Sequence, residues 1–250
     1  MVVPAEEGLL TISGVRVLVA TAVPAERDAV AQAFDSAEGN TTDPTFDVIA
    51  AGVGPAASAA AVASALTAAA LSGTPYDLVV SAGIAGGFQP QAPVGSLVVA
   101  DEITVADLGA ETPDGFVPVT ALGFGAVTHR PPESLVRDLT VATGALPGAV
   151  LTVSTVTGSA ERAAELGARH PGALAEAMEG FGVAEAAAAH GVPVLEIRAV
   201  SNPVGPRDRA AWRIGDALTA LTDAFGKLAP VLESWNPHEH RHEHPRDPAS

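Results

Sequence analysis

The sequence predicts a single α/β domain, in which a mostly parallel or mixed central sheet is flanked by helices. Short apolar runs, each long enough for one buried strand, alternate with segments of helical length and composition. With 48% hydrophobic and 17% charged residues in 250, the chain can bury a large core. We therefore expect one domain over residues 1–233, with its core at about 15–228.

The expected elements follow one another in strand–helix order. Pro24 comes directly after the first strand and suits the first turn of a helix, where its missing N–H costs nothing. Residues 82–87 and 104–147 are rich in turn-forming residues and are expected to form loops. Strands are expected at residues 15–20, 46–51, 77–81, 95–100, 150–154 and 192–200, and helices after Pro24, at 56–71, from about 159, at 176–190 and at 208–228. Ligands bind such sheets beyond the carboxyl ends of the strands, so those loops are the segments to inspect.

Charge and cysteine content exclude several classes of protein. The chain has 29 acidic against 13 basic residues, a formal charge of −16, which argues against binding nucleic acid or an anionic membrane. The absence of cysteine excludes disulfides and thiolate catalysis and fits a cytoplasmic protein. The first residues lack the basic segment of a signal peptide. Residues 48–76 are uncharged and long enough to span a bilayer, but their glycines and prolines favour a strand, a turn and a buried helix.

Residues 234–250 differ from the rest of the chain. Four of the seven histidines lie here, at His238, His240, His242 and His244, and they alternate with charged residues. We expect a disordered His- and Glu-rich tail, with a patch for a divalent metal as the alternative. No second ligand cluster nearby would close a coordination sphere, so no metal site is predicted.

Two glycine-rich segments resemble loops that bind phosphate. Residues 52–57 fit the dinucleotide pattern G-x-G-x-x-A, but they follow the second strand, and no acid ends the next strand. Bound NAD is therefore not expected, and no P-loop motif occurs. Residues 83–87 lack bulky side chains, so their backbone amides could approach a small polar ligand, although a simple turn explains them equally well.

Three polar residues stand where strands end or helices begin. Glu26 opens the first helix, Glu179 lies at the start of an alanine-rich helix, and Asn202 follows the last strand. In a parallel sheet all three would reach the same rim. Each acid alone could serve only to complement a helix dipole. That alternative explains less well why all three follow strands in a core with few charges.

Several ordered motifs carry a family resemblance. Residues 46–54, 77–87, 95–102, 178–180 and 197–202 resemble the purine nucleoside phosphorylase/uridine phosphorylase superfamily, in particular its 5′-methylthioadenosine nucleosidase-like hydrolases. Residues 201–208 are similar to those of the futalosine hydrolases of menaquinone biosynthesis. The resemblance implies a nucleoside phosphorylase-like fold and cleavage of the N-glycosidic bond of a purine nucleoside. It also implies a homo-oligomer that needs no cofactor.

The resemblance also implies roles for particular residues. Glu26 would activate the attacking water, and Glu179 would hold the ribose 2′- and 3′-hydroxyls. Arg198 would keep these acids ionised and in place, or would serve only as a structural ion pair. Met178 would pack against the sugar. Further substrate contacts are expected at Gly83, Ile84, Ala85, Val156 and Ser201. Ile84 departs from the small polar residue of related hydrolases, and residues 154–157 lack their base-stacking aromatic, for which Phe181 is a candidate replacement.

Asn202 bears on which base is released. Related adenine-releasing nucleosidases carry Asp there, whereas an asparagine amide can donate to O6 or N7 of a 6-oxopurine, which favours hypoxanthine. Glu26 occupies the loop in which phosphorylases place an arginine, which favours water over phosphate as the nucleophile. Phosphorolysis, adenine release and a non-catalytic ligand- or metal-binding role on the same scaffold remain alternatives. Arg130, Arg207 and Arg209 are candidates for binding the carboxylate on the aryl group of futalosine.

Overall fold

The computed structural model describes residues 14–34 and 44–237. The predicted histidine cluster at residues 238–244 therefore lies outside the described residues. The strands are β1 Arg16–Thr21, β2 Thr45–Ala50, β3 Leu78–Gly87, β4 Leu97–Val105, β5 Gly109–Thr112, β6 Gly115–Pro118, β7 Thr128–His129, β8 Leu146–Thr152, β9 Ala173–Ala177 and β10 Val194–Pro203. The helices are α1 Pro24–Gln32, α2 Pro55–Leu71, α3 Glu133–Thr143, α4 Ala160–Arg169, α5 Gly180–Ala189 and α6 Ile214–Glu233, with 3₁₀ turns at Val119–Leu122 and Arg209–Ala211.

Five strands close into a ring. β3 pairs with β9, β9 with β8, β8 with β4, β4 with β10, and β10 again with β3. β1 and β2 extend the sheet from β3, and β7 adds to β4. The pairings of β3 with β9 and of β4 with β10 and β7 are antiparallel, while the others in this sheet are parallel. The sheet is therefore mixed, as the sequence allowed, and β3 lies at its centre.

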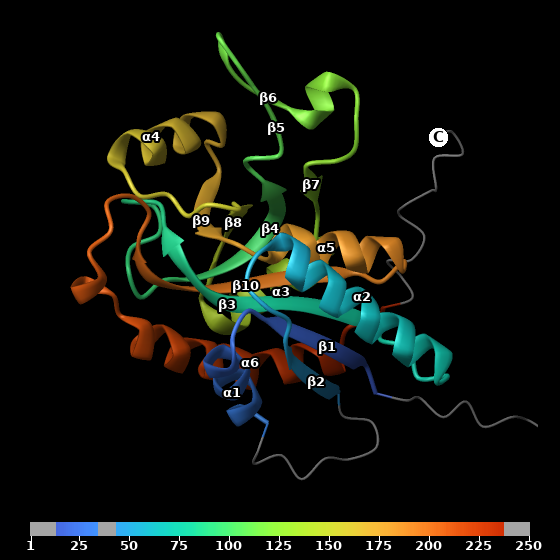
Figure 1. The fold of residues 1–250 in the computed structure, drawn as a ribbon. Coiled ribbons are helices and arrows are strands. Elements are labelled where there is room, and N and C mark those ends of the chain that lie inside the picture. The colour runs from blue at the N-terminus through green and yellow to red at the C-terminus, as the bar shows by residue number, and fades with distance from the viewer. Residues whose placement is uncertain (1–13, 35–43, 238–250) are drawn as a thin grey trace, which may run out of the picture.

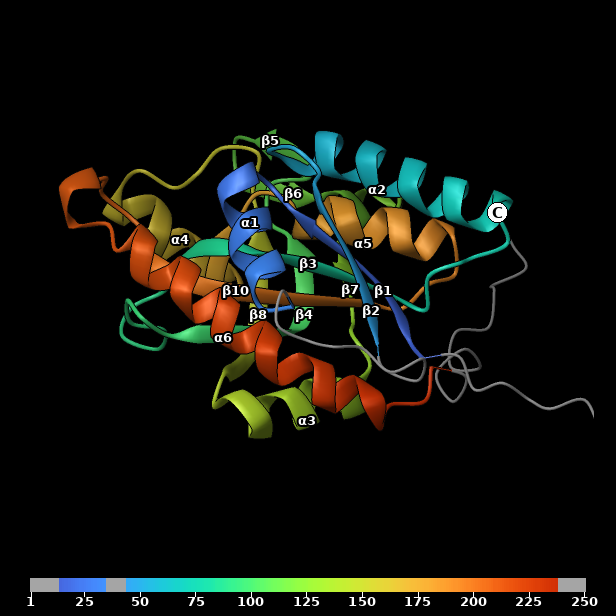
Figure 2. The same cartoon turned by 90° about the horizontal axis from the view of Figure 1, so that it is seen from below.

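Helices cover both faces of the sheet. α2 and α5 pack side by side on one face, where Val62, Leu66 and Phe181 join one buried apolar cluster (Figures 1 and 2). α1, α3 and α6 cover the other face, where Leu135 and Phe225 join a second cluster. The hairpin of β5 and β6 projects from the body (Figure 1). In the described part of the chain, no helix combines the length and the apolar composition that crossing a membrane requires.

The structure corrects several predicted element boundaries. Residues 104–147 were expected to be loops but contain α3, whose Leu135 and Leu139 are fully buried against α6 and the sheet. The helix predicted at 176–190 begins only at Gly180, because residues 173–177 pair with two strands as β9. The final helix begins at Ile214 rather than at 208. For residues 173–177, strand pairing overrides local propensity.

The correction that matters most for the site concerns β3. Residues 82–87 were expected to be a loop after the strand, yet β3 continues through them to Gly87 and pairs there with β10 and β9. Because β9 runs antiparallel to β3, the chain beyond Ala177 returns toward the middle of β3. The residues predicted to meet at strand ends therefore gather around the middle of a strand.

Candidate active site

Glu26 is tied to two segments of backbone. It lies in the first turn of α1, and its side chain is only 4% exposed. Oε2 accepts hydrogen bonds from the N–H groups of Ala22 (3.0 Å) and Val23 (3.3 Å), and Oε1 accepts one from Ile84 (2.9 Å). The first two bonds satisfy the start of the helix, as the dipole alternative predicted. The bond to Ile84 instead joins the carboxylate to β3, so Glu26 also fixes the position of one oxygen beside the central strand.

Gly83 allows charged groups to approach the backbone of β3. A Cβ added at Gly83 would lie 2.6 Å from Nη1 of Arg198 and 2.7 Å from Oε1 of Glu26. Real Cβ atoms do not make contacts this short, so a larger residue would displace one of the two groups. Glycine at this position is therefore required by the packing of Glu26 and Arg198 against the strand.

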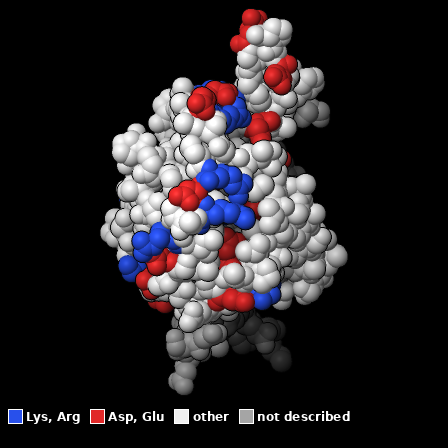
Figure 3. All heavy atoms as spheres, turned by 60° about the vertical axis from the view of Figure 1, so that its left-hand side comes forward, with Lys and Arg blue, Asp and Glu red and all other residues white. Residues whose placement is uncertain are grey.

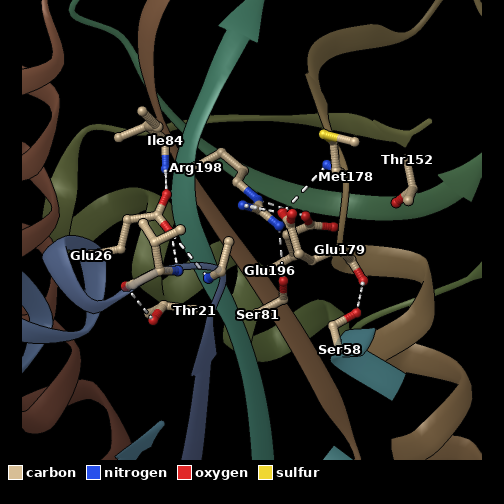
Figure 4. A network of polar contacts seen from close by, with 12 residues as sticks. Thr21, Glu26, Ser58, Ser81, Ile84, Thr152, Met178, Glu179, Glu196 and Arg198 are labelled. Carbon is tan, nitrogen blue, oxygen red and sulfur yellow. Dashed lines mark hydrogen bonds and ion pairs between the residues drawn. The ribbon is translucent and has the colours of Figure 1, made fainter. Parts of the chain in front are cut away.

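Arg198 is the centre of a buried charge cluster (Figure 4). The residue is 1% exposed, and its Nε donates to Oε1 of Glu196 (2.8 Å), while Nη2 donates to Oγ of Ser81 (3.0 Å). Nη1 lies 3.3 Å from Oε2 of Glu179. Burial by itself lowers the pKa of Arg198, but the carboxylates of Glu196, Glu179 and Glu26 outweigh it and raise that pKa. The guanidinium therefore stays positively charged between the acids.

Glu179 reaches the cluster from the end of β9. It is 6% exposed, and its Oε1 accepts from the N–H of Gly54 (3.2 Å) while Oε2 accepts from the N–H of Met178 (3.4 Å). Its backbone carbonyl accepts from the hydroxyl of Ser58 (3.2 Å), which ties the start of α5 to α2. Figure 4 shows Glu26 and Glu179 on opposite sides of Arg198. The two predicted acids thus meet around one guanidinium.

Asn202 lies farther along β10. It is four residues beyond Arg198, which in an extended strand is roughly 13 Å. Its Oδ1 accepts from the hydroxyl of Ser201 (2.8 Å), and its Nδ2 donates to the carbonyl of Pro203 (3.0 Å). A Cβ on Gly86 would lie 3.4 Å from Nδ2, so the amide faces the far end of β3. Asn202 was expected to follow the strand and is instead its penultimate residue.

The other predicted contacts divide into three places. Gly83, Ile84 and Met178 lie at the Glu26–Arg198–Glu179 cluster. Ala85 lies next to Asn202, since its carbonyl accepts a long bond from Ser201 (3.4 Å). Val156 is exposed on the loop after β8. Because a backbone N–H of Ile84 holds Glu26, this contact does not depend on the side chain at that position.

Sequence reasoning missed two buried acids. Glu196 is 0% exposed, binds Arg198 through Oε1, and its Oε2 has no hydrogen-bond partner within the described ranges. Burial raises its pKa. Glu176 accepts from the N–H (2.8 Å) and the hydroxyl (2.5 Å) of Thr157, and burial raises its pKa more than these bonds lower it. The sequence shows only that Glu196, two residues before Arg198 in an apolar strand, shares a face with it.

Comparison with known proteins gives one consistent family. The model of the phosphorylase superfamily matches residues 16–233. Futalosine hydrolase from Streptomyces coelicolor is 73% identical over 89% of this chain and 98% of its own length, and futalosine hydrolase from Acidothermus cellulolyticus is 47% identical over 86% and 90%. Among solved structures, a futalosine hydrolase mutant of Helicobacter pylori aligns with a TM-score of 0.72 at 18% identity, covering 87% of this chain and 99% of the other.

Proposed function

The chain belongs to the phosphorylase superfamily, and we propose that it is an N-glycosidase that hydrolyses futalosine in menaquinone biosynthesis. The products are hypoxanthine and dehypoxanthine futalosine. The relative from Streptomyces coelicolor, named futalosine hydrolase, supports this substrate because the similarity spans nearly the whole of both chains. The observation that carries the chemistry is the pair of buried carboxylates, Glu26 and Glu179, held on either side of Arg198.

Glu26 is the proposed general base. Water attacks the anomeric carbon, Glu26 accepts a proton from that water, and the bond from carbon to the purine nitrogen breaks with its electron pair going to the purine, which leaves as an anion. A proton from solvent converts this anion to hypoxanthine, and Glu26 returns the proton it accepted to solvent. The three backbone N–H groups that bind Glu26 hold it in one orientation, which is the requirement for this role. Glu26→Gln keeps the shape of the side chain and removes the base. Its –NH2 group would face a backbone N–H donor in either orientation, so we expect it to fold with reduced stability and to lose at least about 100-fold in kcat.

Glu179 is the proposed ligand of the ribose hydroxyls. A carboxylate accepts a hydrogen bond from each hydroxyl and stabilises the positive charge that develops on the sugar in the transition state. Met178, its neighbour, packs against the sugar. Arg198 acts through Glu179, because its Nη1 lies 3.3 Å from Oε2 and holds that oxygen in place.

Asn202 is the proposed contact to the purine. Its remaining amide N–H can donate to O6 or N7 of hypoxanthine, which stabilises the electrons that the base gains. Asn202→Asp places an acceptor opposite O6, so we expect the activity on 6-oxopurine nucleosides to fall by about 1,000-fold. The measurement is hypoxanthine release from futalosine, with adenine release from methylthioadenosine as the comparison. An unchanged preference between the two substrates would remove Asn202 from specificity.

The decisive assay is base release with and without phosphate. Futalosine, inosine and methylthioadenosine are incubated with the enzyme, and the products are separated by chromatography. Release of hypoxanthine from futalosine without phosphate is the expected result. Dependence on phosphate would make the protein a phosphorylase, and adenine as the main product would make it a methylthioadenosine nucleosidase. No release from any substrate would favour a binding protein on this scaffold.

The proposed enzyme is a cytoplasmic homo-oligomer. The support for assembly is the exposed side of α2, where Leu71 is 84% exposed and no charged residue occurs within residues 48–76. Such a surface is typical of an interface between subunits. Light scattering after size-exclusion chromatography tests this, and a monomeric mass would contradict it.

A further inference from the structure

The loop between β10 and α6 closes on the rim of the proposed site. The loop begins at Val204, directly after Pro203, the last residue of β10. The N–H of Val204 donates to the carbonyl of Gly87 (2.9 Å). It returns at Arg213, whose N–H donates to the carbonyl of Ser201 (2.8 Å). Both ends of the loop are thus fixed next to Asn202. Side chains carried by the loop lie at the outer end of the site, beyond the carboxylate cluster.

Two arginines of this loop gather around one tryptophan. The guanidinium carbons of Arg207 and Arg209 lie 5.5 and 5.7 Å from the centre of the Trp212 ring. These are cation–π distances, so the half-buried ring restrains both guanidinium groups and keeps them together. The intervening Asp208 forms no ion pair with either arginine in the described structure; its Oδ1 accepts from the N–H of Ala210 (3.1 Å) and caps the short 3₁₀ turn.

The two arginines are exceptional in their lack of a carboxylate partner. Among the residues that the structure describes, every arginine except Arg207 and Arg209 forms an ion pair with Asp or Glu. The chain carries 29 acids against 13 bases, so unpaired arginines are not explained by a shortage of carboxylates. Figure 3 brings this side of the molecule forward and shows basic side chains on it with acidic ones beside them. An arrangement of this kind suits an anion that arrives from outside the protein.

We propose that Arg207 and Arg209, restrained by Trp212, form a subsite for a carboxylate carried by the substrate at the end away from its purine. The proposal rests on the proposed function, because futalosine carries such a carboxylate on its aryl group. Arg130, the other candidate named from the sequence, donates to Oε2 of Glu102 at 2.6 Å. Its charge is therefore already paired with a carboxylate of the protein, unlike the charges of Arg207 and Arg209. The subsite makes the enzyme selective for acidic 5′-substituents over plain nucleosides.

The test compares futalosine with its methyl ester, which differs only in the charge of the carboxylate. The double variant Arg207→Gln/Arg209→Gln is measured beside the wild type, and Lys227→Gln serves as the control, since Lys227 is also without an ion pair to another described residue but lies on α6. In the wild type, esterification should raise KM by about 10- to 100-fold with little change in kcat, because a charged hydrogen bond is lost. The double variant should show the same rise in KM for futalosine itself and no further rise for the ester.

Inosine separates this subsite from the rest of the site. It carries hypoxanthine and ribose without the aryl carboxylate, so its hydrolysis should be the same in the wild type, the double variant and the control. If the wild type cleaves futalosine and its ester equally well, the subsite is wrong while the proposed function stands. An equal loss of futalosine and inosine activity in the double variant would also overturn it. If the wild type releases no hypoxanthine from futalosine, the proposed function fails, and the subsite fails with it.

Discussion

Gly83→Ala tests the central cluster with a single methyl group. The added Cβ would lie 2.6 Å from Nη1 of Arg198 and 2.7 Å from Oε1 of Glu26. Both atoms are at the ends of side chains, so they can move, whereas the backbone of β3 is held by strands on either side. We therefore expect the protein to fold and the charged groups to be displaced.

The size of the displacement follows from the same distances. Ordinary van der Waals contact begins at 3.4 Å, so Oε1 of Glu26 must move by about 0.7 Å, which weakens its 2.9 Å bond to the N–H of Ile84. A misplacement of about 1 Å in a catalytic group can cost about 100-fold in rate. We expect kcat/KM for futalosine to fall by roughly 30- to 100-fold. Weakening the buried hydrogen bonds should cost about 1–3 kcal/mol of stability.

The control is the same substitution where there is room for it. Gly226 lies inside α6 with no atom within 4 Å of an added Cβ, so Gly226→Ala should leave activity unchanged. It should raise the free energy of unfolding by about 0.5–1 kcal/mol, because glycine disfavours a helix interior. Activity is measured by hypoxanthine release and stability by urea unfolding. A Gly83→Ala enzyme with wild-type kcat/KM would refute the argument that the position of Glu26 beside β3 is needed for catalysis.

Two further predictions concern titration. Burial raises the pKa of Glu196, so its contribution to stability is complete below the ordinary glutamate pKa and is lost as pH rises through the folded-state pKa. Glu196→Gln removes this titration, so calorimetry should show the Tm of the variant rising relative to that of the wild type as pH is raised above the ordinary glutamate pKa; a difference that does not change with pH would contradict this. Tyr76 is the one tyrosine of the chain, and burial together with its hydrogen bond to Asp47 (2.7 Å) raises its pKa to about 12. Phenolate absorbance should therefore rise with a midpoint near pH 12, and the free energy of unfolding should fall as pH rises from about 10 to 12. Asp47→Asn should lower the midpoint of the absorbance change. Titration of the folded protein at the ordinary tyrosine pKa would count against the contact between Tyr76 and Asp47.

Local sequence was sufficient for much of the fold. Pro24 marked the first turn of α1, and Ser159 caps α4 through a bond from the N–H of Arg162 (3.2 Å), close to where that helix was expected. The class of fold is confirmed by the mixed sheet with helices on both faces. Helix α3 and strand β9 were missed because their identity depends on partners distant in the chain. The alanine-rich residues 173–177 have no strand propensity of their own and become a strand by pairing with β8 and β3.

Most residues of the candidate site were predicted from the sequence, but their arrangement was not. Glu26 and Glu179 do meet around Arg198, but Asn202, the third residue expected at the same rim, lies roughly 13 Å beyond Arg198 along β10. The expected reason, a common rim of parallel strands, is wrong for Glu179. It arrives from a strand antiparallel to β3. Glu196 was overlooked because buried acids are rare in apolar strands, and the pattern of Glu196 and Arg198 on one face has meaning only once the strand is known to be enclosed. The catalytic roles of these residues stay predictions.

The closed ring has a consequence for how the enzyme moves. Every strand in the ring is hydrogen-bonded on both sides, whereas β2 and β7 each have a single neighbour in the described chain. Amide protons of β3 and β10 should therefore exchange with solvent only when the whole molecule unfolds, while those of β2 exchange by fraying. Substrate then enters a scaffold that is already rigid. Adjustment during turnover is therefore left to the loops that connect the strands of the ring.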